Sequence, residues 1–256
     1  MKIKVLGSSS GWAIPRIGCG CKICSSTNEK DKRLRPSILI NDSILVDAGP
    51  DVYHQFLRFK KSKVDSIILT HSHPDHIFGL HDLIPKKVKA MKGVPIYGSE
   101  KTWTALNRLF PNAEYKKEIF EDYKPFEAGG LKFTPVPVVH SKSAPTVGFV
   151  VEYRNSILCY FPDFRSFIKE EDKKYVEGVD CLFLDGSMLN NPFPVWTNKW
   201  GHISIVEGVK LATQCRVKKT IFTHIGHRTL PHDDLSELLR KKGEFYAAFD
   251  GMNLEI

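Results

Sequence analysis

The segment THSHPDH contains four side chains that commonly bind metal ions. They are His71, His73, Asp75 and His76, and they follow an apolar run that predicts a strand. At an extended strand end, residues two apart point the same way, so His71 and His73 could share one metal ion. Pro74 begins a helical turn that would direct Asp75 and His76 to a neighbouring point. Imidazole and carboxylate are preferred ligands of first-row metals, so the spacing favours two adjacent metal ions over a polar loop whose histidines only form hydrogen bonds.

Three more residues of the same types lie at the ends of other predicted strands. His140 ends PVVH, Asp163 ends YFPD and His224 ends IFTH. Each alone would be read as a solvated polar residue at the end of a buried strand. Together they repeat one placement, which is the placement required for a catalytic centre on the rim of a pair of sheets.

Three of the six cysteines lie in one short loop, GCGCKIC, as Cys19, Cys21 and Cys24. The loop could be a disulfide element, a redox loop or a metal site. The chain starts MKIKVLGSSSG, which predicts a strand and a turn rather than a signal peptide, so we expect a cytoplasmic protein with reduced thiols. Clustered thiols in that compartment favour a metal site. Cys159, Cys181 and Cys215 lie in apolar stretches and are expected to be buried and inert.

Apolar runs alternate with amphipathic stretches along the whole chain, which predicts a layered α/β protein with sheets at its centre and a single domain over residues 1–256. The predicted strands are 2–7, 37–41, 43–49, 66–71, 94–98, 131–140, 146–154, 156–163, 180–186 and 219–226. The predicted helices are 51–61, 100–109, 165–176, 203–215 and 232–242. Asn41-Asp42 is the expected turn of a hairpin. The prolines of TPVPVV place that segment at an edge or make it a bent strand.

Composition narrows the function classes only a little. Hydrophobic residues make up 42% and charged residues 26%, as in an ordinary folded protein. No run approaches the roughly 18 apolar residues of a membrane span, so no membrane partner is expected. The formal charge of +8 suits nucleic acid or small phosphorylated substrates, but also a plain lysine-rich surface, because the lysines are scattered.

The segment HSHPDH, followed by isolated His140, Asp163 and His224, resembles the HxHxDH signature of the metallo-β-lactamase superfamily. The resemblance implies a four-layer αββα sandwich with a two-metal site at one sheet edge. It implies that the first metal binds His71, His73 and His140, and that the second binds Asp75, His76 and His224. Asp163 would bridge the two metals, and Asp47 in LVDAG would support the site.

Both ends of the chain resemble one branch, the phosphoribosyl cyclic phosphodiesterases of bacterial phosphonate breakdown (the carbon–phosphorus lyase pathway). The shared features are the cysteine cluster, THIGHR, the final FDGMNLEI and WGHIS at the start of a helix, whereas residues 83–130 match only loosely. The resemblance implies a structural zinc held by Cys19, Cys21, Cys24 and His227. Three thiolates and one imidazole make a closed tetrahedral set. It also implies that His202 is catalytic. The alternative is that His202, at the start of a helix, only forms a hydrogen bond to the neighbouring loop.

These features predict a metal-dependent phosphodiesterase that hydrolyses a small cyclic phosphodiester, of the phosphoribosyl cyclic phosphate or 2′,3′-cyclic nucleotide type. Two divalent ions, zinc or manganese, would activate a water as hydroxide. His202 would protonate the leaving oxygen or stabilise the phosphorane, and Asp75 is the other residue expected to act in catalysis. The expected partners are a small phosphorylated substrate and a second copy of the chain in a homodimer. Phe193, Trp196 and Trp200, in the loop 187–201, could cover the substrate or only pack the loop.

Two other functions remain open. A ribonuclease Z-like RNA-processing endonuclease shares the HxHxDH core and suits the basic charge, but the chain has no glycine- and lysine-rich insertion of suitable size. A non-catalytic or biosynthetic-accessory member, as in pyrroloquinoline quinone synthesis, shares the cysteine loop but tends to lack the full ligand set. β-Lactamase activity is not expected, because Asp163 and both ends of the chain point to phosphoester chemistry.

Overall fold

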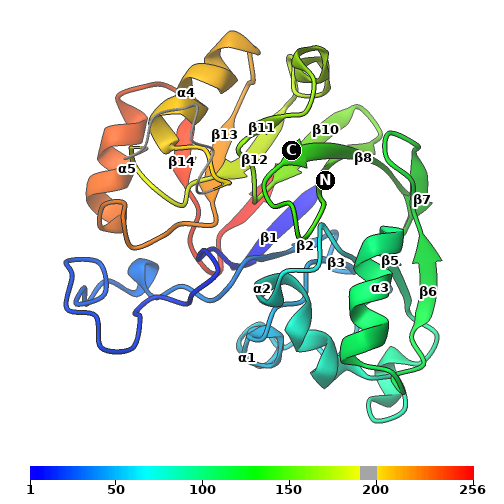
Figure 1. Cartoon of the computed structure of the whole chain (residues 1–256). Helices are drawn as coiled ribbons and strands as arrows, with labels where there is room; N and C mark the ends of the chain where they lie inside the picture. The colour runs from blue at the N-terminus through cyan, green and yellow to red at the C-terminus, as the bar shows by residue number, and fades with distance from the viewer. Residues whose placement is uncertain (191–200) are drawn as a thin grey trace.

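The computed structural model describes residues 1–190 and 201–256, and its strands form two sheets that face each other (Figure 1). The strand order of the first sheet is β15-β1-β2-β3-β4-β5-β6. Its strands are β1 (Lys2–Gly7), β2 (Ser37–Ile40), β3 (Ile44–Val46), β4 (Ser66–Ile68), β5 (Pro95–Gly98), β6 (Lys116–Ile119) and β15 (Asn253–Glu255). From β3 to β6 the neighbouring strands run parallel, so their carboxyl ends meet at one edge.

The strand order of the second sheet is β11-β8-β9-β10-β12-β13-β14, with β7 also paired to β8. Its strands are β7 (Phe126–Ala128), β8 (Leu131–Val139), β9 (Thr146–Tyr153), β10 (Ser156–Phe161), β11 (Ser166–Phe167), β12 (Cys181–Asp185), β13 (Thr220–Thr223) and β14 (Phe245–Ala247). Strands β10, β12, β13 and β14 are parallel, so their carboxyl ends also share an edge.

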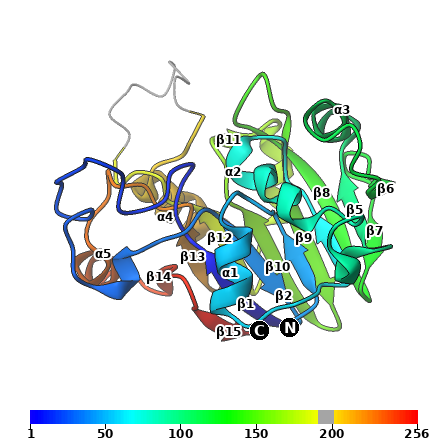
Figure 2. The same ribbon diagram turned by 90° about the horizontal axis from the view of Figure 1, so that it is seen from below.

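Helices cover the outer face of each sheet, which gives the layered αββα arrangement expected from the sequence (Figures 1 and 2). The helices are α1 (Val52–Arg58), α2 (Pro74–Ile77), α3 (Glu100–Leu109), α4 (Ile205–Gln214) and α5 (His232–Arg240). Short 3-10 turns are η1 (Glu29–Asp31), η2 (Phe78–Leu83), η3 (Lys89–Met91) and η4 (Glu170–Tyr175). Core residues of α1 and α3 pack on the first sheet, and those of α4 and α5 pack on the second.

The two-residue period of the strands divides the core into layers. In β2, Ile38 and Ile40 enter the core between the sheets, whereas Leu39 joins the core under α1 and α3. In β13, Ile221 faces the first sheet and Phe222 faces α4 and α5. Successive side chains of a strand point to opposite faces, so apolar residues at consecutive positions fill two cores at once.

The structure corrects several predicted elements. Residues 165–176 are not one helix: Ser166–Phe167 pairs with β8 as β11, and η4 follows as a 3-10 turn. Strands β6, β7 and β14 were not predicted, because they are short and β6 reads KKEI with a largely exposed pattern. The proline-bearing strand β8 lies second from the edge, and only its ends are paired on the outer side, by β7 and β11. The unpaired stretch contains Pro135 and Pro137, which lack an N–H to donate.

Other expectations are confirmed. Asn41 and Asp42 both have positive φ angles and join β2 to β3 as a hairpin. Cys159, Cys181 and Cys215 are buried, and burial raises the pKa of each thiol, that of Cys181 to about 12. Among the described residues, we find no helix with the length and apolar character needed to cross a membrane.

Candidate metal centre and active site

The predicted histidines and aspartates converge where strands of both sheets end. His71 lies shortly after β4, His140 directly after β8, Asp163 after β10 and His224 directly after β13. These four side chains follow four separate strands, and each is at most 5% exposed. The fold therefore brings together residues that are up to 153 positions apart, since parallel strands place their carboxyl ends at a common edge.

One group consists of His71, His73 and His140, whose ligand atoms all lie within 4.8 Å of one another. Nε2 of His140 is 3.2 Å from Nδ1 of His73. The second group consists of Asp75, His76 and His224, again within 4.8 Å. Oδ2 of Asp75 lies 3.2 Å from Nε2 of His76 and 3.5 Å from Nε2 of His224. These are the two sets that the sequence resemblance implied.

Asp163 lies between the two groups. Its Oδ1 is 3.4 Å from Nε2 of His140 in the first group. The same oxygen is 3.3 Å from Nε2 of His224, and Oδ2 is 2.9 Å from Nε2 of His76, both in the second group. One carboxylate thus reaches both groups, as a bridging ligand must.

Several buried atoms in this cluster have no hydrogen-bond partner in residues 1–190 and 201–256. They are Nε2 of His71, Nε2 of His76, both ring nitrogens of His224 and Oδ2 of Asp163. Buried polar atoms are normally paired, so a concentration of unpaired ones needs an explanation. The close approaches between these imidazoles and the carboxylate do not have hydrogen-bond geometry. The donor set of imidazoles and carboxylates, aimed at common points, fits two divalent cations.

Neighbouring side chains orient the candidate ligands. Asp47 is completely buried, and its Oδ2 lies 2.7 Å from Nδ1 of His76, which leaves Nε2 of that ring facing the cluster. The backbone N–H of Thr70 donates to Oδ1 of Asp47 at 2.9 Å, and the hydroxyl of Thr70 lies 3.0 Å from Nδ1 of His71. Such contacts fix the orientation and tautomer of metal-binding histidines. The contacts of Asp47 with His76 and Thr70 match the supporting role that the resemblance implies for Asp47.

The backbone around α2 requires a glycine. A Cβ on Gly49 would lie 1.9 Å from the carbonyl oxygen of Asp75. The N–H of Ala48 donates to the carbonyl of His76 at 2.8 Å, so the loop after β3 packs directly against the turn that carries Asp75 and His76. Only a residue without a side chain permits this approach.

The histidines of the cluster fall into two kinds according to the direction in which their pKa values are shifted. Burial lowers the pKa of His71, His73 and His140, so these rings stay neutral, which is the form that binds a metal. Burial also opposes a charge on His76, but the carboxylates around it, above all Asp47, raise the pKa of His76 well above its ordinary value. The neighbouring imidazoles likewise outweigh burial and lower the pKa of Asp163. The raised pKa of His76 and the lowered pKa of Asp163 place a positive ring beside negative carboxylates.

His202, the predicted catalytic histidine, lies beside this cluster. Its Nδ1 is 2.5 Å from Oδ2 of Asp185 and 4.0 Å from Oδ1 of Asp163. Burial disfavours the charged ring, but the charge of Asp185 raises the pKa of His202 to about 9. Asp185 also accepts hydrogen bonds from the backbone N–H groups of Phe164 (3.1 Å) and Ser187 (2.9 Å).

Asp185 was not among the residues predicted from the sequence. It ends β12 in DCLFLDG, and it is fully buried. The signal was available, because an aspartate closing a buried apolar strand is the same placement that singled out Asp163.

The segment around His202 is tied to the ends of the ligand-bearing strands. Nδ1 of His140 lies 2.8 Å from the carbonyl oxygen of Gly201, and the N–H of Ile203 donates to Phe164 O at 2.6 Å. Glu207, in the first turn of α4, accepts hydrogen bonds from the N–H and hydroxyl of Ser204 and from Nη1 of Arg165. These contacts hold the backbone of His202 in place relative to Asp163 and His140.

A cleft of about 450 Å³ opens over the cluster. His73, Asp75, Asp163 and His202 line its floor, and Trp12, Arg16 and Arg228 also line it. Its size suits a small ligand. Phe193, Trp196 and Trp200, which were considered as substrate contacts, lie outside the described residues.

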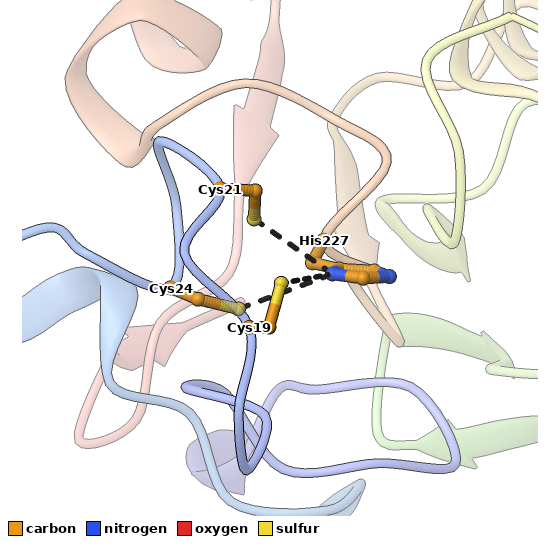
Figure 3. A group of neighbouring side chains, drawn as sticks. All are labelled: Cys19, Cys21, Cys24 and His227. Carbon is orange, nitrogen blue, oxygen red and sulfur yellow. Dashed lines mark hydrogen bonds between the residues drawn. The ribbon is translucent and has the colours of Figure 1, made fainter.

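Figure 3 shows the cysteine cluster, in which Cys19, Cys21 and Cys24 lie around the ring of His227. The three cysteines do not line the cleft. Nδ1 of His227 is 3.4, 3.7 and 3.9 Å from the sulfur atoms of Cys19, Cys21 and Cys24. Zn–S bonds of about 2.3 Å and Zn–N bonds of about 2.0 Å in a tetrahedron place sulfur roughly 3.5 Å from nitrogen. The four residues therefore fit the closed zinc set that the resemblance implied. None of the three thiols forms a disulfide.

The ring of His227 connects this cluster to the cleft, since it is one of the cleft-lining residues. The backbone N–H of Arg16, another lining residue, lies 3.4 Å from Sγ of Cys24. The loop with the cysteines and the segment after β13 therefore both contribute to one wall of the cleft.

Comparison with known proteins agrees with this geometry. A family model described as a β-lactamase superfamily domain matches residues 42–225, which hold the candidate ligands of the buried cluster. The chain belongs to the metallo-β-lactamase superfamily. Among solved structures, a new diphosphatase from the PhnP family is 34% identical, with a TM-score of 0.84 over 100% of this chain and 97% of that one. The chain therefore resembles a member of the PhnP family over its whole described length.

Other proteins match this chain at lower identity, and one of them is a solved structure with a similar fold. The human short-form tRNase Z is 17% identical with a TM-score of 0.70 over 100% of this chain and 99% of its own. Coenzyme PQQ synthesis protein B of Acinetobacter baylyi is 24% identical over 100% of both chains. An octanoyltransferase of Porphyromonas gingivalis is 25% identical over 98% of this chain, which spans only 51% of that relative.

Proposed function

We propose that this chain is a metal-dependent phosphodiesterase that hydrolyses a small cyclic phosphodiester. The observation that carries the proposal is the position of Asp163, within 3.4 Å of imidazoles of both candidate metal groups and 4.0 Å from His202. A two-metal ligand set with a cationic side chain beside it matches the charges of a phosphodiester undergoing in-line displacement.

His71, His73 and His140 would hold one cation, and Asp75, His76 and His224 the other, with Asp163 shared. Bound cations would supply an activated water and positive charge for the phosphate oxygens. Zinc and manganese both suit this ligand set, and a third ion, zinc, suits the closed cysteine set.

The chain's own contribution to the chemistry centres on His202. Asp185 holds Nδ1 of the ring at 2.5 Å, so a proton on Nε2 is available to the cleft that His202 lines. Hydrolysis of a phosphodiester releases an alkoxide, which needs a proton as the P–O bond breaks. His202 would donate that proton, and Asp185 would stabilise the charged ring beforehand. In a cyclic ester the released oxygen remains tethered, so the product is a phosphomonoester.

The small cleft favours a small substrate over a folded RNA. A volume of about 450 Å³ suits a cyclic nucleotide or sugar phosphate, and Trp12 at 64% exposure offers a ring for a base or sugar to contact. The 34% identity to a diphosphatase of the PhnP family also favours small phosphate esters.

The discriminating experiment is a substrate panel run with metal analysis. It would contain a phosphoribosyl cyclic phosphate, 2′,3′-cyclic nucleotides, a bis-aryl phosphate and a precursor tRNA. Turnover of the cyclic esters with about two metal ions in the buried cluster supports the proposal. Cleavage of the precursor tRNA alone would establish a ribonuclease Z-like activity instead. Metal binding without turnover of any substrate would favour a non-catalytic role in a biosynthetic pathway, the class suggested by the similarity to coenzyme PQQ synthesis protein B.

A further inference from the structure

A second hollow, of about 570 Å³, is lined mainly by lysines. The lysines are Lys86, Lys87, Lys89, Lys92 and Lys116, and we call this feature the lysine hollow. Pro85, Gly93, Glu114 and Tyr115 complete its wall. Its lysines come from two segments, one between α2 and β5 and the other at the start of β6, at the lower right of Figure 1.

The lysine hollow is separate from the metal centre. Strands β4, β5 and β6 run parallel, and Pro95 at the start of β5 pairs with Lys116 at the start of β6. The hollow therefore lies at the amino ends of these strands. His71 follows the carboxyl end of β4, so the two sites lie at opposite edges of the same sheet.

The charges in the hollow are poorly balanced. Lys86 forms an ion pair with Glu114, and Nζ of Lys116 lies 3.9 Å from Oε1 of Glu118. Lys87, Lys89 and Lys92 have no ion pair with any residue in the ranges that the structure describes. Like charges gathered around a concave surface repel each other and attract an anion, which would relieve that repulsion.

The backbone that carries these lysines is held in a defined shape. The N–H groups of Lys87 and Val88 both donate to the carbonyl of Ile84 at 2.9 Å. Met91 is only 2% exposed, so it anchors the η3 turn in the core while Lys89 and Lys92 stay outside. The hydroxyl of Tyr115 donates to Leu80 O at 2.7 Å, which fixes the opposite wall. A ligand would therefore meet a preformed site rather than a loose tail.

We propose that the lysine hollow binds a compact polyphosphate anion, such as the triphosphate group of a nucleotide or inorganic tripolyphosphate. The volume is within the range of small-molecule sites. The lysines surround one hollow instead of forming a stripe. The aromatic residue in its wall is Tyr115, whose hydroxyl already donates a hydrogen bond to Leu80 O. A longer nucleic acid would need a basic track with rings to stack on.

The test is titration of the full-length, metal-loaded chain with inorganic tripolyphosphate and, separately, with adenosine triphosphate. Calorimetry gives the affinity, and amide NMR shifts give the location. The key variant is Lys87→Gln/Lys89→Gln/Lys92→Gln. Removing three exposed charges, each contributing a few-fold, is expected to weaken tripolyphosphate binding by about tenfold or more. The amide of Gly93 should shift on titration in the unmodified chain and not in the variant.

The matched control is Lys60→Gln/Lys63→Gln/Lys210→Gln, which removes the same charge from exposed positions outside the hollow. Affinity in this control should stay within about twofold of the unmodified chain. Equal binding of both ligands would assign recognition to the phosphate chain alone, and tighter adenosine triphosphate would assign it to a nucleotide.

Two results overturn the proposal. The first is tripolyphosphate binding that is unchanged in the lysine variant, with shifts confined to residues around His71–His76, because the anion would then occupy only the metal centre. The second is a twelve-nucleotide RNA that binds more tightly than tripolyphosphate with the same dependence on the three lysines, because the hollow would then belong to a nucleic-acid surface.

Discussion

The molecule has two clusters of metal-binding residue types, and they are built in different ways. The histidine–aspartate cluster draws on the ends of strands in both sheets, and its members are mostly buried. The cysteine cluster lies in a surface loop with one histidine from another segment, and all four of its residues are partly exposed. The first has a carboxylate shared by two groups and a cleft above it, whereas the second is a complete set of four ligands.

The difference teaches how ligand number relates to role. Four ligands close a tetrahedral site and leave no position for a substrate, so the cysteine cluster is suited to hold two chain segments together. Each buried group would hold its cation with three ligands of its own and a share of Asp163, and a cation in a catalytic site can expand to five ligands, which admits a water or substrate atom. We therefore assign chemistry to the buried cluster and support to the loop cluster, and the following predictions test that division.

The largest effect is expected from emptying the buried cluster. The double substitution His71→Ala/His76→Ala removes one ligand from each group, so turnover of a cyclic phosphodiester should fall by about a thousandfold or more. Metal analysis should show that the chain still retains its loop zinc. A variant that keeps all its metal would contradict the assigned ligands.

Removing the proton donor should cost less and leave the metals in place. His202→Ala is expected to lower kcat by about a hundredfold or more, the usual contribution of a general acid. Asp185→Asn keeps the shape but removes the charge beside Nδ1 of His202, so a smaller loss of about tenfold is expected. Steady-state kinetics with metal analysis checks both variants. Full activity in His202→Ala would contradict the assignment of His202 as the proton donor.

Breaking the loop cluster should release metal with a moderate effect on turnover. Cys21→Ser is expected to lose one zinc per chain and to lower activity by about tenfold, because His227 and Arg16 both line the cleft. Limited proteolysis should show faster cleavage near residues 16–24. The matched control is Cys215→Ser, which alters a buried thiol outside the cluster and should leave the metal content unchanged.

The smallest effect is expected from the contacts that hold the His202 segment. Glu207→Gln weakens the bonds to Ser204 and Arg165 and should lower kcat by about threefold, with little change in KM. Glu237→Gln is the control, because that exposed residue of α5 forms an ion pair only with Lys241 among the described residues. A change in KM without a change in kcat would show that Glu207 acts on substrate binding instead.

The same two regions show how far sequence alone could reach. The candidate ligands were predictable because each ends an apolar strand or belongs to HSHPDH, and local patterns encode both features. The grouping of Cys19, Cys21 and Cys24 with His227 came only from the resemblance, since nothing local relates residues about 200 positions apart.

Contacts that depend on tertiary packing were not predicted. The pairing of Glu207 with Arg165 and of Asp185 with His202 requires knowledge of which strand ends meet. Strand β6 was missed because KKEI carries no apolar alternation, and its strand form results from pairing with β5. Residues 165–176 were predicted as a helix, yet Ser166–Phe167 instead extends the sheet beside β8 and a 3-10 turn follows.

The most direct test of the division between the clusters is to count metal ions and measure cyclic phosphodiester turnover in three proteins. The account predicts about three metal ions per chain in the unmodified protein, about two in Cys21→Ser and about one in His71→Ala/His76→Ala. Turnover should survive in Cys21→Ser and vanish in the double histidine variant. Turnover that followed the loop zinc instead, and persisted without metal in the buried cluster, would contradict it.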